Sequence, residues 1–121
     1  IDEKLLRAYD VVRLANQAGR SKAAVGVPAG DVDSATRKVI EDHGFGEFFI
    51  HRTGHGLGLE IHEEPYINPE NDFVLKRGMT FTIEPGIYIP GLGGIRIEDD
   101  VYLKTSGLVS LTSLPRELII V

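Results

Sequence analysis

The sequence contains no cysteine among its 121 residues. This absence excludes disulfides, thiolate zinc sites and a cysteine nucleophile, so a bound metal would have to be held by His, Asp or Glu side chains. No signal peptide is recognisable either. Together these absences predict a cytoplasmic protein.

Long apolar runs and clusters of basic residues are also missing. No apolar run approaches the ~20 residues of a membrane helix, so no membrane partner is expected. The formal net charge is -5, and the 13 basic residues are scattered along the chain, which argues against nucleic acid as a partner. With 42% hydrophobic and 26% charged residues, the chain has the composition of one soluble globular domain.

An amphipathic helix is predicted from Asp2 to about Gln17, because apolar residues recur there at intervals of four and three. Acidic residues at its start suit the positive end of the helix dipole. The apolar stripe consists of Ile1, Leu5, Ala8, Val12 and Ala15.

A second helix is predicted to begin with Asp31 as its N-cap and to end at Gly44. Asp31 and Asp33 together could also be a carboxylate pair that binds metal. The simpler interpretation is that Asp31 caps the helix and Asp33 lies in a solvated first turn. The inner face of this helix is expected to contain Val32, Ala35, Val39 and Ile40.

Beyond the second helix the hydrophobic pattern alternates, as in half-buried strands. The segment GMTFTIEPG, residues 78–86, predicts a strand with the carboxylate of Glu84 at its end. The segment GGIRIEDDVYL, residues 93–103, predicts a second strand that brings Glu98 near Glu84. Asp99 falls on the apolar face of this strand, so a bulge or an ion pair is expected there.

Two further segments complete the predicted sheet. The glycine- and proline-rich segment IYIPGLGG, residues 87–94, is expected to be a loop that returns the second strand beside the first. The tail LTSLPRELIIV, residues 111–121, is expected to form a short last strand.

The segment HRTGHGLGLEIHEEP, residues 51–65, combines three histidines with glycines. Its glycine spacing does not match a dinucleotide or phosphate loop. A zinc-protease helix with the pattern H-E-x-x-H is excluded as well, because Tyr66 stands where the second histidine would be and Pro65 would break the helix. The segment is therefore interpreted as a flexible stretch that presents His55, with glycines that let the backbone approach a ligand.

His55, Glu84 and Glu98 could together hold metal ions. Carboxylates can bridge two divalent cations and imidazole suits a terminal position, a mixture that fits Mn, Co, Fe or Zn better than Mg or Ca. Each residue also has an ordinary interpretation, in which the strand glutamates are solvated charges and the histidine is a loop residue. Arg96 could likewise be only an ion-pair partner of Glu98 or Asp100.

Three segments in order resemble the metallopeptidases of the pita-bread fold, in the branch of aminopeptidase P and prolidase (Xaa-Pro dipeptidase). They are HRTGHGLGLEIHEEPYI, GMTFTIEPGIYIPG and GIRIEDDVYL. The resemblance covers nearly the whole chain. It implies an α+β fold in which two helices pack on a curved antiparallel sheet. Methionine aminopeptidases share several of these elements but do not normally have R-I-E-D-D around the last glutamate.

The resemblance also implies roles for individual residues. His55, Glu84 and Glu98 match ligands of a dinuclear centre, and Glu84 also matches a residue that serves in proton transfer. His51 and His62 match histidines that contact the substrate and stabilise the tetrahedral intermediate. Arg96 matches an arginine that orients the glutamates. The implied reaction is attack by a metal-bridging hydroxide on the carbonyl group that precedes proline.

One departure from the family pattern concerns the ligand set. The family supplies two further ligands, an Asp pair on a strand hairpin upstream of the first helix, and this sequence has no counterpart. Because the sequence also begins with Ile1, we expect residues 1–121 to be the C-terminal half of a catalytic domain within a longer parent protein. The isolated chain is then expected to be inactive and to self-associate through an uncovered apolar edge or face.

The sequence thus predicts a metal-dependent peptidase that takes a proline-containing peptide as substrate, with two divalent ions in the complete domain. One alternative is a pita-bread module that has lost catalysis and binds peptides or proteins. Another is a methionine aminopeptidase. The retained histidines and glutamates favour the Xaa-Pro enzyme.

Overall fold

A computed structural model describes residues 2–57 and 63–111. Two α-helices come first, α1 (Glu3–Lys22) and α2 (Ala29–Asp42), followed by a short 3-10 helix (Gly46–Phe48). Within the described residues seven strands follow, which confirms the expected α+β class. They are β1 (Gly54–Gly56), β2 (Glu63–Ile67), β3 (Thr80–Ile83), β4 (Gly86–Ile89), β5 (Gly93–Arg96), β6 (Asp99–Lys104) and β7 (Gly107–Ser110).

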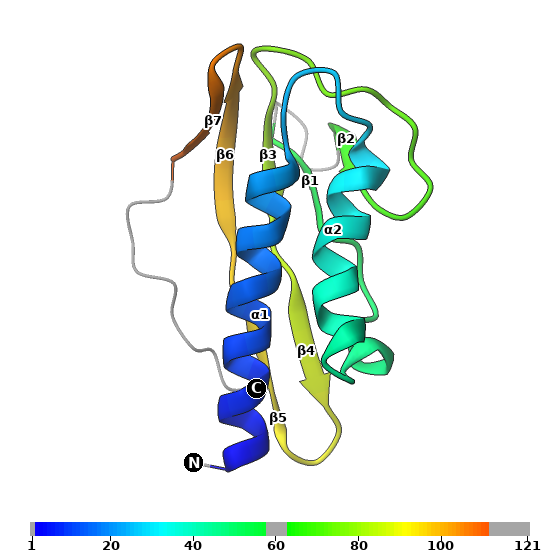
Figure 1. Cartoon of the computed structure of the whole chain (residues 1–121), viewed down its shortest axis with the longest axis vertical. Coiled ribbons are helices and arrows are strands. Elements are labelled where there is room, and N and C mark those ends of the chain that lie inside the picture. The colour runs from blue at the N-terminus through cyan, green and yellow to red at the C-terminus, as the bar shows by residue number, and fades with distance from the viewer. Residues whose placement is uncertain (1, 58–62, 112–121) are drawn as a thin grey trace.

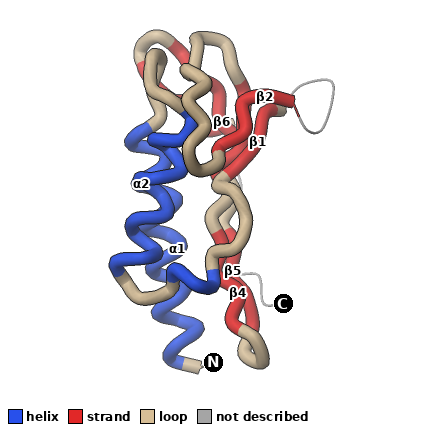
Figure 2. The backbone as a smooth tube through the Cα atoms, turned by 90° about the vertical axis from the view of Figure 1, so that its right-hand side faces the viewer, coloured by secondary structure: helices blue, strands red, loops and turns tan. Residues whose placement is uncertain are grey.

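The strands form two antiparallel sheets. The larger sheet has the order β2-β1-β3-β6-β7, and the smaller sheet is the hairpin β4-β5. The hairpin continues the line of β3 and β6 toward the lower end of the molecule (Figure 1). Both helices lie on the same side of the strands (Figure 2), so the expected arrangement of two helices on an antiparallel sheet is confirmed.

Helix α1 is longer than the sequence pattern predicted. The side chain of Asp2 accepts a hydrogen bond of 2.7 Å from the backbone N–H of Lys4, which fixes the start of the helix. Its buried face continues past the last apolar residue of the stripe through Asn16 and Gly19. A hydrophobic pattern cannot reveal this extension, because one of these residues is polar and the other has no side chain.

Helix α2 begins at Ala29 rather than after Asp31, so Asp31 is not the N-cap. Pro28 takes the N-cap position, since its fixed φ suits the residue at which a helix starts. The expected end at Gly44 is confirmed, because Gly44 adopts a φ of 84° directly after the helix. The expectation of a solvated Asp33 was wrong: this side chain is buried.

The strands differ from the prediction at several points. The segment 51–65 was interpreted as a flexible stretch, but it contains β1 and the start of β2. Residues 93–103 form two strands, with a break at Ile97 and Glu98. The predicted loop 87–94 contains most of β4, so the connection to β5 is a tight turn around Pro90. Strand β7 was not predicted, and the predicted tail strand lies almost entirely outside the described residues.

Asp99 confirms the expectation of an ion pair on the apolar face. Its carboxylate is 1% exposed and lies 3.6 Å from Nε of Arg20 in α1. The hydroxyl of Ser110 in β7 donates a second contact to it at 3.1 Å. A buried carboxylate with both partners can be accommodated among apolar neighbours.

Two hydrophobic clusters form the core. One joins α1 and the end of α2 to the β4-β5 hairpin, and the other joins the start of α2 to β2, β3 and β6. Along the chain, Ile83 belongs to the second cluster and Ile87 to the first. On the neighbouring strand, Ile97 belongs to the first cluster and Val101 to the second. Glu84 and Glu98 therefore lie where both long strands pass from one cluster to the other.

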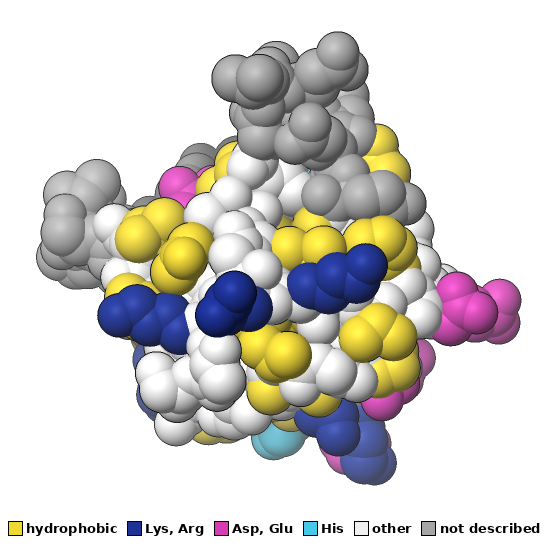
Figure 3. All heavy atoms as spheres, turned by 90° about the horizontal axis from the view of Figure 1, so that it is seen from above, with side chains coloured by type: hydrophobic (Ala, Val, Ile, Leu, Met, Phe, Trp, Pro, Cys, Tyr) yellow, Lys and Arg dark blue, Asp and Glu magenta, His cyan; other side chains and the backbone are white. Residues whose placement is uncertain are grey.

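Within residues 2–57 and 63–111, neither helix is long and apolar enough to cross a membrane. On the face seen from above, hydrophobic side chains are interspersed with Lys and Arg side chains (Figure 3).

Candidate metal centre

The two glutamates lie at a break in strand pairing. Strands β3 and β6 are paired up to Ile83 and Asp99, and pairing resumes in the hairpin between Gly86 and Arg96. Pro85 lies in the gap, where a proline cannot donate a ladder hydrogen bond. Between the two ladders the backbone N–H of Ile97 donates to the Pro85 carbonyl at 3.2 Å. The break places Glu84 and Glu98 on neighbouring strands, as expected.

Strand β1 brings His55 beside Glu84. The backbone N–H of His55 donates to the hydroxyl of Thr82 at 3.0 Å, which attaches this short strand to β3. The ring nitrogen Nε2 of His55 lies 3.6 Å from a carboxylate oxygen of Glu84. A histidine and a carboxylate that are predicted metal ligands are thus adjacent.

Gly54 has a different role from the expected one. A Cβ at this position would overlap the backbone carbonyl of Thr82, so only glycine allows β1 and β3 to approach this closely. The expectation was that the glycines beside His55 make room for a ligand. At Gly54 the space is taken by the neighbouring strand.

Arg96 lies beside Glu84, one of the two glutamates that the resemblance expects it to orient. Its guanidinium nitrogen lies 3.7 Å from a carboxylate oxygen of Glu84. A cavity of about 340 Å³ opens over these side chains. It is lined by His51, Arg52, His55, Asn68, Glu84 and Arg96. Four residues predicted from the sequence therefore face one space.

Glu98 has the largest perturbation in the site. Burial raises its pKa to about 7, and a hydrogen bond with Asp100 and the nearby charge of Glu84 add to the shift. A bound cation would compensate the negative charges of these carboxylates. Asp100 was not singled out from the sequence, although it is adjacent to the R-I-E-D motif.

The donor set fits a divalent ion but does not form a complete cage. Histidine nitrogen and carboxylate oxygens are suitable ligands for Mn, Co, Fe or Zn. Nevertheless, no group of three or more His, Asp or Glu side chains in the described part of the chain is arranged to hold a metal ion. The pair His55 and Glu84, with Glu98 on the next strand, is what this chain itself brings together.

His51 lies at the edge of the cavity as a half-buried imidazole. Burial lowers its pKa, so the neutral form is favoured at pH 7. Its Nδ1 contacts the carbonyl oxygen of Arg52 at 2.6 Å, and because a carbonyl only accepts, Nδ1 carries the proton. Nε2 is then an acceptor, and it is buried with no hydrogen-bond partner among the described residues. A ligand in the cavity could donate to it.

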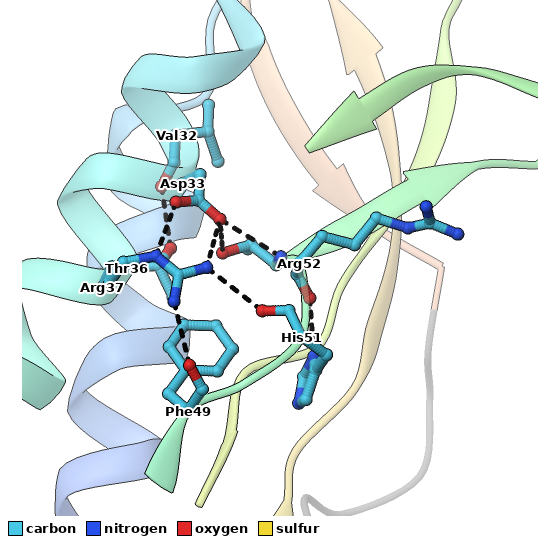
Figure 4. A network of polar contacts seen from close by, with 8 residues as sticks. Val32, Asp33, Thr36, Arg37, Phe49, His51 and Arg52 are labelled. Carbon is cyan, nitrogen blue, oxygen red and sulfur yellow. Dashed lines mark hydrogen bonds and ion pairs between the residues drawn. The ribbon is translucent and has the colours of Figure 1, made fainter. Parts of the chain in front are cut away.

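A polar network from α2 holds the segment that carries His51 (Figure 4). The guanidinium of Arg37 pairs with Asp33 at 2.9 Å and donates to the carbonyls of Phe49 and His51 at 3.0 and 3.1 Å. Asp33 in turn accepts from the hydroxyl of Thr53 at 2.8 Å. Sequence reasoning missed this network, although an acid and a base four residues apart on a helix are a recognisable signal.

His62, the remaining predicted site residue, lies outside the described residues. Its predicted contact with substrate therefore stays a prediction.

Comparison with known proteins gives consistent matches along the chain. The model of metallopeptidase family M24 matches residues 1–105. An Xaa-Pro dipeptidase of Lactobacillus delbrueckii subsp. lactis is 49% identical over 116 residues, which are 96% of this chain and 32% of that protein. The crystal structure of a dipeptidase from Pyrococcus horikoshii OT3 matches with a TM-score of 0.93 and 56% sequence identity. The match covers 99% of this chain and 34% of that one.

A more distant structure shares the fold alone. The N-terminal domain of the FACT complex subunit SPT16 from chickpea has a TM-score of 0.87 at 21% identity, over 94% of this chain and 30% of that one. The chain spans about a third of the length of the curated relatives it matches.

Proposed function

The chain belongs to metallopeptidase family M24 and has its α+β pita-bread fold, and from this premise we propose that the complete protein hydrolyses the peptide bond before proline. The substrate would be a dipeptide or the N-terminus of a peptide. Relatives at 48 and 49% identity that are named Xaa-Pro dipeptidases support this substrate class. The observation that carries the proposal is the convergence of His51, His55, Glu84 and Arg96 on one cavity beside Glu98.

We assign His55, Glu84 and Glu98 as the residues of this chain that would hold divalent metal, with two ions in the complete domain. When bound, such ions would supply an activated water and compensate negative charge on the reacting carbonyl. The raised pKa of Glu98 supports the assignment, because carboxylates that repel one another are stabilised by a cation.

The other side chains of the cavity would bind and orient the substrate. His51 presents the acceptor Nε2 and would receive a hydrogen bond from an N–H or O–H group of the substrate. His62 would contact the substrate as well. Arg96 would hold the carboxylate of Glu84 in place, since the two lie 3.7 Å apart. Glu84 would then accept or deliver a proton at its carboxylate oxygen.

The test uses the complete protein that contains this sequence, loaded with Mn²⁺, Co²⁺, Fe²⁺ or Zn²⁺ in separate samples. We expect two ions per chain by calorimetry and cleavage of Ala-Pro but not of Met-Ala. Glu98→Gln should lose the activity, whereas Glu47→Gln, an exposed glutamate outside the cavity, should keep it. Preferential cleavage of Met-Ala would identify a methionine aminopeptidase, and peptide binding without cleavage would identify a non-catalytic module.

The isolated 121-residue chain is proposed to be inactive, because it would offer only three ligands. Titration of this chain with Mn²⁺ should give at most one weak site, and His55→Ala should abolish that site. Two sites per chain, lost in the His55→Ala variant, would contradict the proposed ligand set.

A further inference from the structure

Asn16 of α1 is a polar residue that is 0% exposed, and its side chain faces the strand break. Its amide nitrogen donates to two backbone carbonyls, that of Ile83 at 3.2 Å and that of Ile97 at 3.3 Å. These carbonyls directly precede Glu84 and Glu98 in the chain. One side chain of the helix layer therefore contacts both glutamate strands at corresponding positions.

Arg20 fixes the direction in which the Asn16 carboxamide points. Its Nε donates to the carboxamide oxygen at 2.7 Å. Because a guanidinium can only donate, the atom that faces Arg20 must be the oxygen, and the NH₂ group must face the two carbonyls. Arg20 also lies 3.6 Å from the buried carboxylate of Asp99, the residue that follows Glu98. The carboxamide is thus held at both ends.

The strand break explains why this contact can determine geometry. In a continuous antiparallel ladder, backbone hydrogen bonds fix the spacing of neighbouring strands. Here regular pairing stops at Ile83 and Asp99 and resumes at Gly86 and Arg96. The two glutamates lie between these paired residues, where the hydrogen bonds of Asn16 add to the one from the N–H of Ile97 to the carbonyl of Pro85 in setting their separation.

Because the peptide group is planar, the hydrogen bonds of Asn16 also restrict the positions of the glutamate backbones. The carbonyl of Ile83 lies in the same rigid plane as the backbone nitrogen of Glu84, and the same relation links Ile97 to Glu98. Fixing both carbonyls on one carboxamide fixes the relative placement of the two glutamate backbones. Metal ligands need placement within about 0.5 Å, which depends on the residues that support them.

We propose that Asn16 is a positioning residue that sets the separation of Glu84 and Glu98 for metal binding. This inference rests on the proposed function, because it assumes that both glutamates hold metal. Asn16 itself does not reach the metal or the substrate, since its polar atoms are committed to the two carbonyls and to Arg20.

The test measures Mn²⁺ affinity of the complete folded protein by calorimetry, well below its unfolding temperature. Asn16→Ala should raise the Kd for Mn²⁺ by about 10- to 100-fold, the effect usual for residues that support metal ligands. Asn71→Ala is the matched control, because the Asn71 carboxamide also bonds backbone groups, at Tyr66 and Phe73, but away from the glutamates. The control is expected to lose some stability but to keep the wild-type Kd.

A second variant covers the case in which Asn16→Ala does not fold. Asn16→Ser keeps a hydroxyl donor at the same position and should give a Kd between the wild-type and alanine values. A wild-type Kd in the Asn16 variants, or an equal rise in Asn71→Ala, would overturn the inference while the proposed function stands. A wild-type protein that binds no divalent ion would overturn both.

Discussion

The two halves of the candidate site are supported by different helices in different ways. Helix α2 holds the histidine arm, residues 49–55, through the charged pair of Asp33 and Arg37. Helix α1 holds the glutamate strands through the neutral carboxamide of Asn16. In both cases a helix side chain donates hydrogen bonds to backbone carbonyls of the segment that carries the predicted groups. The site is thus shaped from the helix layer, although its predicted chemical groups come from the strands and the loop before them.

The difference between the two supports lies in their energetics. Removing one partner of a buried ion pair strongly lowers the stability of the fold, because the other charge is left without compensation. A neutral carboxamide that is removed leaves unsatisfied carbonyls, which costs less. Removing the support of the histidine arm should therefore lower the stability more. Removing the support of the glutamate strands should lower the metal affinity more.

The largest effect should come from Arg37→Ala. The variant leaves Asp33, which is 1% exposed, without its cation, and we expect a loss of about 3–5 kcal/mol in unfolding free energy. Chemical denaturation of wild type and variant measures the difference. Lys38→Ala is the control, because it removes an exposed ion pair with Asp42 of similar spacing, worth at most about 0.5 kcal/mol. Equal losses in the two variants would remove the proposed distinction between the halves.

A smaller effect is expected for Gly54→Ala, which tests how the two halves are joined. The added Cβ would overlap the Thr82 carbonyl and push β1 away from β3, at a cost of about 1–3 kcal/mol. His55 would move away from Glu84, so Mn²⁺ affinity should fall together with stability. Unchanged affinity in a destabilised variant would show that β1 does not set the distance between these residues.

The smallest effect concerns His51 and pH. Burial lowers the pKa of His51 in the folded protein, so the unfolded chain binds the proton more readily. Stability from this group is present above the unfolded pKa of about 6.5 and is lost as pH falls through the lower folded pKa. Glu98 acts in the opposite direction over this range, because its raised pKa makes the folded protein bind a proton more readily than the unfolded chain. Denaturation of the metal-free wild type and of His51→Gln at pH 7.5 and 5.5 isolates the contribution of His51, since both proteins keep Glu98. Relative to the variant, the wild type should lose stability as the pH falls, and an identical change in both proteins would contradict the lowered pKa of His51.

The helices and the strands β3, β5 and β6 followed from the sequence because their periods are regular. The stripe from Leu5 to Ala15 and the alternation of Phe81 and Ile83 both mark faces that are buried in the structure. Asp99 was recognisable as an exception to this pattern, and its ion pair with Arg20 resolves it. The break at Ile97 and Glu98 was not visible, because the apolar alternation continues through it.

The site was predictable in its members but not in its supports. His55, Glu84 and Arg96 could be named from the motifs that resemble the peptidase family, and the structure brings them to one cavity with His51. The supporting roles of Asn16 and Asp33 carried no such signal, since Asn16 is a polar residue beyond the apolar stripe and Asp33 resembles a solvated helix start. Their partners are 67 and 20 residues away in the chain.

By itself, the sequence determined the residue types available for chemistry, the two helices and the strands that carry the glutamates. It could do so because side-chain chemistry and hydrophobic period are local properties. Only the tertiary structure decided that Gly54 serves strand packing, that Arg37 holds the histidine arm and that Asn16 joins the two glutamate strands. The physical reason is that these contacts join groups far apart in the sequence, and which groups meet is decided only when the helices pack on the sheet.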